Sequence, residues 1–293
     1  MEISVHPCDS DDVKQLLKEF SRLLVLLNQA KDEKFITITL KHIQFITPFL
    51  ALFLSVSINM IKNAGCEVHL EKPHNPDLIS YLDTIYFETG VSFQTKEECV
   101  SFLGSHSAKS FLPILHFSAS EDSLQTEIRD SMISASINLL RSKLNLNAQQ
   151  INLYRYLIQE MVDNILQHAC VDNGWLFAQY YPKKQYLDLC ILDTGITILG
   201  SFQKHGFTHV DNHLDAIQSA VEGTSTKPDT GRGYGLSSSL KAMLETKSDF
   251  ILISGDGLLH NQTLYKLPSS WPGTIVFFRI PLSIYFSVYE LFS

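Results

Sequence analysis

Glu160 and Asn164 combine two residue types that can act together on a metal-bound phosphate. The segment around them follows a helical pattern, so residues four apart share a face and the two side chains lie one turn from each other. An amide oxygen is a ligand that Mg²⁺ accepts, and a carboxylate can orient or deprotonate a nucleophile near a phosphate. Alone, such a pair is usually a solvated helix face, so its meaning depends on the other motifs.

A second candidate is the turn Asp193-Thr194-Gly195, which follows the apolar segment 187–192. A carboxylate at the end of a strand can accept a hydrogen bond from an exocyclic amine, and a glycine lets the main chain approach a flat base closely. An ordinary turn can consist of the same three residues. The motif therefore indicates a base-reading site only in combination with a place for phosphates.

Alternating glycines could supply that place, in the run Gly231-Arg232-Gly233-Tyr234-Gly235-Leu236 at the start of a helical pattern. Such a run exposes main-chain N–H groups, and a helix N-terminus adds partial positive charge, which together can bind phosphates. A flexible glycine-rich loop is an equally good interpretation of the run alone. The chain has neither the G-x-G-x-x-G spacing of Rossmann folds nor the G-x-x-x-x-G-K-[ST] of P-loops, which excludes both classes.

The elements that must position these residues fall into two domains, residues 1–105 and 106–293. In the first, the patterns predict helices over 11–30, 47–63 and 75–87 and strands over 35–40 and 66–70. This alternation is typical of a small α/β domain. The polar, weakly patterned segment 95–110 is the expected linker.

The second domain is expected to combine two long helices with a sheet. Strands are predicted over 111–117, 176–181, 187–192, 250–254 and 274–280. Helices are predicted over 121–144 and 148–170, separated by an Asn-rich turn, and again near 214–221 and after Gly235. The set is of the α+β kind.

Composition and charge limit the functions of the chain. The formal net charge is 23 − 31 = −8 without a long basic run, so we expect no nucleic-acid surface. The apolar segment 45–61 is shorter than the roughly 20 residues of a membrane-spanning helix, so we expect a buried helix and no membrane segment. Five widely spaced cysteines without a C-x-x-C pair indicate a reducing compartment, and no apolar leader is visible. We therefore expect a cytoplasmic protein.

The order and separation of the three motifs resemble the N box and the two glycine boxes of the GHKL superfamily (gyrase, histidine kinase and MutL ATPases). The resemblance covers residues 110 to 283. Residues 121–169, two helices that end in Gln167-His168-Ala169, are most similar to the anti-sigma-factor serine kinases. The resemblance implies a Bergerat-type α/β sandwich, in which helices cover a mixed sheet, with ATP and Mg²⁺ bound.

The resemblance also implies roles for the catalytic and phosphate-binding residues. Glu160 would be the catalytic base or would orient water, and Asn164 would be the Mg²⁺ ligand. The run 231–236 would wrap the phosphates. Lys227, in the lid expected over 223–230, would reach the β- or γ-phosphate.

For the base, the resemblance implies that Asp193 and Thr274 read adenine while Gly195 lines the base pocket. Thr197 departs from the family, whose first glycine box reads D-x-G-x-G with glycine at this position. A β-branched residue restricts the backbone there. We therefore expect Thr197 to alter ATP affinity or lid geometry, which leaves binding better supported than turnover.

Residues 1–95 are more loosely similar to STAS domains, the fold of anti-sigma-factor antagonists. Antagonists carry a phosphorylatable serine at the start of a helix, where this chain has Pro48. Thr47 is the nearest hydroxyl, and its expected role is a helix N-cap. The resemblance implies a docking or dimerising module, and hence a regulatory protein partner of unknown identity or a homodimer.

Three functions stay open. The leading one is an ATP-binding regulatory protein that acts as an ATPase switch or as a Ser/Thr protein kinase. The second is a sensor histidine kinase-like protein, but residues 121–150 contain no histidine, so the acceptor would belong to another protein. The third is a non-catalytic ATP-binding scaffold, which Thr197 weakly favours.

Two further segments have chemistry that these functions do not use. His205, His209 and His213 recur every four residues and could bind Zn²⁺ from one helix face, although Gly206 and Asn212 disfavour a helix there. Residues 281–293 are mostly apolar and could form an edge strand or a tail that pairs with a partner.

Overall fold

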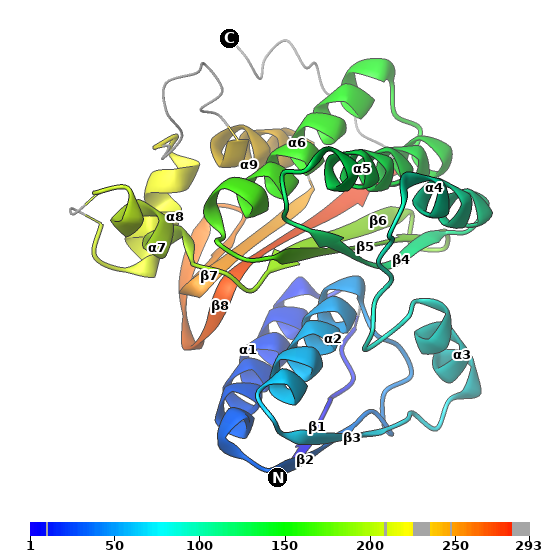
Figure 1. Ribbon diagram of the computed structural model, residues 1–293, viewed down its shortest axis with the longest axis vertical. Helices are drawn as coiled ribbons and strands as arrows, with labels where there is room; N and C mark the ends of the chain where they lie inside the picture. The colour runs from blue at the N-terminus through cyan, green and yellow to red at the C-terminus, as the bar shows by residue number, and fades with distance from the viewer. Residues whose placement is uncertain (10, 208–209, 225–234, 247, 283–293) are drawn as a thin grey trace. The chain divides into compact units, whose positions relative to one another are not determined.

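The computed structural model describes residues 1–293 with the exception of 10, 208–209, 225–234, 247 and 283–293. The chain divides into two compact units, Met1–Val91 with Leu267–Ser269, and Ser92–Lys266 with Ser270–Ser293 (Figure 1). Both units combine helices and strands, which confirms the predicted mixed α/β character. Among the residues that the structure describes, no helix is long and apolar enough to cross a membrane.

The first unit contains a three-stranded parallel sheet. Its strands pair in the order β1 (Glu2–Ser4), β2 (Phe35–Thr39) and β3 (Glu67–Glu71). Parallel neighbours need crossover connections, and the helices α1 (Val13–Gln29) and α2 (Pro48–Asn63) supply them. A short 3-10 helix (Ala30–Asp32) follows α1, and α3 (Pro76–Thr84) follows β3. Strand β1 is missing from the sequence prediction, because the first twelve residues are mostly polar.

Helix α2 begins where the sequence predicts. Thr47 is its N-cap, with the side-chain hydroxyl accepting a hydrogen bond from the Leu50 N–H at 3.3 Å, and Pro48 occupies the first helical position. The Thr47 side chain is only 1% exposed. Phe49 and Phe53 pack edge-to-face on Phe20 of α1, with ring centroids 5.1 and 4.7 Å apart. The apolar segment 45–61 is therefore a buried helix, as predicted.

The expectation of a linker over residues 95–110 is wrong, because helix α4 (Lys96–Ser105) occupies most of it. Thr95 caps the helix by accepting a hydrogen bond from the Glu98 N–H at 3.1 Å. Cys99 and Leu103, one turn apart, are buried. With only two buried positions, the apolar pattern is too sparse to reveal the helix from sequence. The compact units consequently divide between Val91 and Ser92, ahead of the expected boundary at 105/106.

The second unit is built on a five-stranded sheet. The order is β4 (Phe111–Ser118), β5 (Asn173–Tyr181), β6 (Tyr186–Asp193), β8 (Thr263–Pro281) and β7 (Asp249–His260). Every described pairing in it is antiparallel, so the expected mixed sheet is wrong. Strands β4 and β5 are antiparallel because the two helices between them form a hairpin. The hairpin returns the chain to the same end of the sheet at which β4 finishes. Ser118 consequently pairs with Asn173.

The helical hairpin consists of α5 (Ser123–Lys143) and α6 (Ala148–His168). With α9 (Gly235–Glu245) they lie over one face of the sheet (Figure 1). The Asn-rich turn between α5 and α6 ends in a capping box, in which Asn147 and Gln150 each accept the other's main-chain N–H at 2.9 Å. Helix α7 (Ile198–Lys204), which the sequence does not predict, and helix α8 (His213–Val221) connect β6 to α9.

Strand β7 bends back on itself at Gly255. Gly255 has φ +63°, and the Asn261 N–H donates to the Phe250 carbonyl at 2.8 Å, so the end of the strand returns to its beginning. A side chain at Gly255 would collide with the imidazole of His213 at the start of α8. The bend therefore makes room for α8, which packs on this strand.

A buried ion pair crosses the sheet from β6 to β8. Asp188 and Arg279 are direct cross-strand partners, and Arg279 donates to both carboxylate oxygens of Asp188 at 2.8 Å. Its guanidinium also lies 4.2 Å from the centre of the Tyr186 ring. Asp188 raises the pKa of Arg279, although burial of the guanidinium acts in the opposite direction.

Candidate functional site

The Asp193 carboxyl is the most unusual group at the end of strand β6. It is 3% exposed, and its Oδ1 accepts the Gly195 N–H at 2.8 Å. Burial raises its pKa from 3.8 to about 7, although the main-chain N–H groups of Gly195 and Thr274 stabilise the charged form. The structure therefore brings together Asp193, Gly195 and Thr274, three residues that the resemblance assigns to one site.

Two glycines let the main chain close tightly around this carboxyl. A Cβ at Gly195 would collide with the Ala169 carbonyl, and a Cβ at Gly273 would collide with the main-chain and side-chain oxygens of Asp193. Trp271 adds a hydrogen bond from its indole N–H to the Asp193 carbonyl at 2.9 Å. The chain packs around Asp193 so closely that neither position has room for a side chain.

Ser254 connects this loop to strand β7. Its hydroxyl accepts the Ile198 N–H at 2.9 Å, and it lies 3.3 Å from the Gly273 carbonyl and 3.4 Å from the Thr274 hydroxyl. Sequence reasoning misses both Ser254 and Trp271. The only local signal for Ser254 is its place at the start of Ser-Gly-Asp-Gly, where a turn is expected after an apolar strand.

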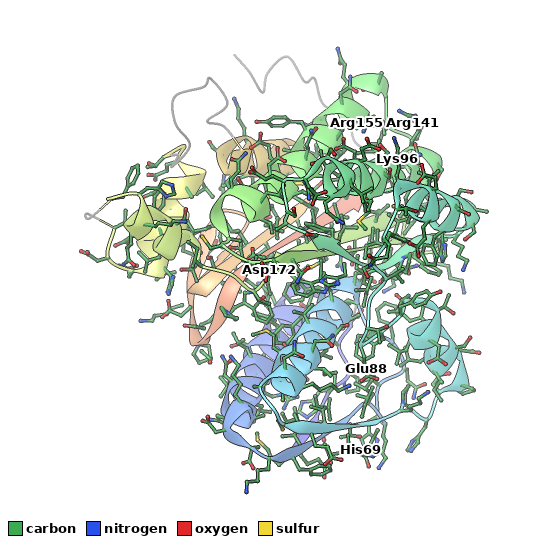
Figure 2. All side chains as sticks on the ribbon, viewed as in Figure 1. His69, Glu88, Lys96, Arg141, Arg155 and Asp172 are labelled. Atoms are coloured by element: carbon green, nitrogen blue, oxygen red, sulfur yellow. The ribbon has the colours of Figure 1, made fainter. Side chains whose placement is uncertain are left out.

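Helix α6 meets the Asp193 loop at its carboxyl end. The Ile196 N–H donates to the Ala169 carbonyl at 2.7 Å, directly after the last residue of α6. Asn164 and Glu160 precede Ala169 by five and nine residues, which places them about 7 and 13 Å back along the helix axis. Glu160 is 5% exposed and Asn164 is half-buried, so neither is on a solvated helix face. Asp172, which follows the helix, is labelled in Figure 2.

Thr197 has a structural role in this loop. It is the N-cap of α7, where its hydroxyl accepts the Gly200 N–H at 3.1 Å. Phe202 of the same helix is buried in an apolar cluster with Val210 and Ala216. A cap on α7 gives a physical reason for a hydroxyl-bearing residue at this position.

The predicted phosphate-binding run is described only at its end. Gly235 is the first residue of α9, as expected, and Leu236 packs against the cluster of Phe202 and Val210. Lys227 and the residues Gly231, Arg232, Gly233 and Tyr234 lie outside the described residues.

His205 and His213 lie at the ends of two different helices and do not share a helix face. His205 follows the last residue of α7, where its Nδ1 lies 2.8 Å from the Ser201 carbonyl, and His213 is the first residue of α8. His209 lies outside the described residues. In the described part of the chain, no three His, Cys, Asp or Glu side chains are placed to hold a metal ion. Gly206, with φ +82°, separates the two helices.

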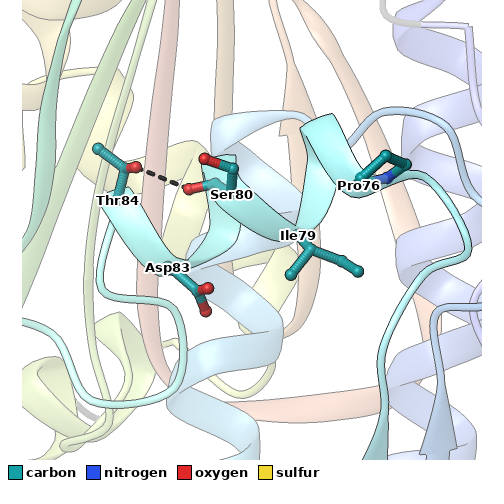
Figure 3. A pocket seen from close by; sticks show the side chains of 5 residues that line it. All are labelled: Pro76, Ile79, Ser80, Asp83 and Thr84. Carbon is teal, nitrogen blue, oxygen red and sulfur yellow. Dashed lines mark hydrogen bonds between the residues drawn. The ribbon is translucent and has the colours of Figure 1, made fainter.

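A shallow hollow in the first unit is a weaker candidate for a functional site. It is about 450 Å³, and one side of helix α3 lines it: Pro76, Ile79, Ser80, Asp83 and Thr84 (Figure 3). The Thr84 hydroxyl already donates to the Ser80 carbonyl at 2.6 Å. A single helix face with one carboxylate offers little to define a ligand.

Comparison of the chain with models of protein families, with curated proteins and with solved structures finds no match. The interpretation of the site therefore depends on its own geometry. That geometry combines a buried hydrogen-bond acceptor, a closely approaching main chain and a helix that carries a carboxylate and an amide.

Proposed function

We propose that this chain is an ATP-binding regulatory protein with a GHKL-type nucleotide site in its second unit. The proposal depends above all on one observation, the buried Asp193 carboxyl enclosed by Gly195, Gly273 and Thr274. A buried acceptor at the end of a strand, with glycine main chain on two sides, suits the edge of a flat base. The layer of α5, α6 and α9 over a five-stranded sheet supports a Bergerat-type sandwich, although the sheet is antiparallel where the resemblance implies a mixed one.

Asp193 would select adenine through its unused acceptor capacity. An ionised carboxylate has about four acceptor sites, of which main-chain N–H groups occupy some. Adenine presents an amino group at the position where guanine presents a carbonyl. A carboxylate attracts the first and repels the second, so we expect about 10- to 100-fold preference for ATP over GTP.

The phosphates would lie toward α9 and the face of α6 that carries Glu160 and Asn164. Mg²⁺ usually binds one or two protein oxygens together with phosphate oxygens and waters, so Asn164 is a sufficient protein ligand. When bound, the ion would neutralise charge on the phosphates. Glu160 would orient or deprotonate the attacking group, and residues 231–236 with Lys227 would hold the phosphates.

The first unit would act as a STAS-like docking or dimerising module. The Thr47 hydroxyl is buried and used as a helix cap, so it is a poor phosphoacceptor. Helix α5 contains no histidine, so it lacks the acceptor of a sensor histidine kinase. The phosphoryl acceptor, if one exists, would therefore be water or a side chain of a partner protein.

The test is incubation with Mg²⁺ and γ-labelled ATP, followed by separate assays of retained nucleotide, released phosphate and labelled protein. Glu160→Ala and Asn164→Ala should abolish phosphate release or transfer, whereas Gln159→Ala, an exposed neighbour on α6, should not. Retained ATP without release or transfer in the wild type would favour the non-catalytic scaffold. Wild-type protein that retains no ATP would exclude the proposed function.

A further inference from the structure

A cavity of about 460 Å³ lies between helices α4 and α5 of the second unit. Its wall includes the leucines Leu103, Leu112 and Leu139, and the small residues Gly104 and Ala135 leave space between the helices. This volume is within the range of small-molecule sites, which are mostly apolar with a few polar groups. It is formed by residues other than those around Asp193.

His106 presents an acceptor to this cavity. It lines the cavity although its side chain is only 6% exposed, and its ring stacks on Phe102 with centroids 4.5 Å apart. Its Nδ1 lies 2.9 Å from the Phe102 carbonyl, so we assign the proton of the neutral ring to Nδ1. Nε2 is then an acceptor, and it has no hydrogen bond to any residue that the structure describes. Nε2 is accessible from the cavity, so a bound hydrogen-bond donor can pair with it.

The polar side of the cavity carries more negative than positive charge. Glu127 and Asp130 lie one turn apart on α5, and both line the cavity. Lys96, labelled in Figure 2, pairs with Glu127 at 3.2 Å. Asp130 forms no ion pair with the described residues. Asp130 is an exposed carboxylate beside an apolar wall, and this combination suits a ligand with both a positive charge and an apolar body.

We propose that the α4–α5 cavity binds a small aliphatic amine that carries a second hydrogen-bond donor, such as an amino alcohol. The ammonium group lies against Asp130, the hydrocarbon body against Leu103, Leu112 and Leu139, and the second donor meets His106 Nε2. Ser134 borders the cavity from α5, so a larger side chain there fills the ligand's place.

The test uses 4-aminocyclohexanol as the probe and titration calorimetry of the full chain. Cyclohexylamine lacks the second donor, and cyclohexanol lacks the charge. We expect the amino alcohol to bind most tightly, cyclohexylamine more weakly and cyclohexanol not measurably. Equal binding of cyclohexanol, or no binding of the amino alcohol, would overturn the proposal.

Substitutions in and near the cavity test whether the amino alcohol binds at this place. Asp130→Asn should weaken binding about tenfold or more, because it removes a charge-assisted contact. Ser134→Leu should abolish binding by filling the cavity. Glu97→Gln, which removes an exposed carboxylate of α4 that does not line the cavity, should have no effect. Asp130 is exposed, so its variant should fold even if Ser134→Leu does not, and unchanged affinity in Asp130→Asn would contradict the proposed site.

Discussion

Asp193 is a carboxyl group whose protonation should be coupled to folding. Its pKa is raised from 3.8 to about 7 by burial, so between these pH values the folded protein holds a proton that the unfolded chain has lost. The free energy of unfolding should therefore fall as pH rises from about 4 to 7. For a shift of this size the loss is on the order of 4 kcal/mol at most.

The measurement is urea unfolding between pH 5 and pH 8 for the wild type and Asp193→Asn. Asparagine keeps an acceptor for the Gly195 N–H but does not titrate. The stability of the variant relative to the wild type should increase with pH through this range and level off above about pH 7. A difference that is independent of pH would show that Asp193 is ionised throughout.

Gly273 is the second residue whose identity the site requires. Gly273→Ala should destabilise the protein by about 1–3 kcal/mol, because the added Cβ meets two oxygens of Asp193. Gly104→Ala in α4 is the control, since nothing lies within 4 Å of the position its Cβ would occupy. That control should be neutral or should stabilise by up to about 1 kcal/mol. Equal thermal stability of the two variants would contradict the packing described around Asp193.

Among the elements, helix α7 depends on its cap. Thr197→Ala should destabilise the protein by about 1 kcal/mol, and Thr197→Gly by only a few tenths, because glycine is a tolerated N-cap. Thr197→Gly also restores the D-x-G-x-G spacing of the GHKL resemblance. If Thr197 limits turnover, this variant should hydrolyse or transfer ATP phosphate faster than wild type. An equal rate in both would show that the cap is structural only.

The pairing of β6 with β8 depends on the buried Asp188–Arg279 ion pair. Asp188→Asn should cost about 3–5 kcal/mol, because it leaves the Arg279 guanidinium buried without its countercharge. The double variant Asp188→Leu/Arg279→Met should recover much of this loss, since no buried charge remains. Chemical denaturation of both variants measures the difference. A double variant less stable than Asp188→Asn would mean that the pair itself stabilises the sheet.

The elements that the sequence predicts correctly carry strong local signals. Helices α1, α2, α5 and α6 have capping residues and long apolar patterns, and their bounds agree with the prediction to within about three residues. Helices α4 and α7 have few buried positions, so their patterns are weak. The bend of β7 depends on the packing of His213 against Gly255, which are distant in sequence and cannot be paired from local patterns.

At the scale of the whole molecule, some residues of the candidate site could be predicted from the sequence and others could not. The GHKL resemblance implies that Asp193, Gly195 and Thr274 lie together, and the structure places them together. Trp271 and Ser254 reach the same loop through the β8 and β7 strands, and no short motif connects them to Asp193. Sheet registration decides these contacts, and the all-antiparallel pairing was not apparent from the sequence.

Asp193→Asn offers a sharp probe of the nucleotide site. Because Oδ1 of the asparagine can keep the Gly195 hydrogen bond, its amide NH₂ would face the base as a donor. The variant should therefore repel the amino group of adenine and accept the carbonyl of guanine. At pH 8 the wild-type carboxyl, with a pKa of about 7, is mostly ionised. The difference between the charged acceptor of the wild type and the neutral amide of the variant is therefore large at this pH.

The most direct measurement is calorimetric titration of the full chain at pH 8 with Mg²⁺-ATP and Mg²⁺-GTP, for the wild type and Asp193→Asn. The wild type should bind ATP at least about tenfold more tightly than GTP, and the variant should lose that preference. Equal affinities of the wild type for the two nucleotides, no binding of ATP, or an unchanged preference in the variant would contradict an adenine site at Asp193.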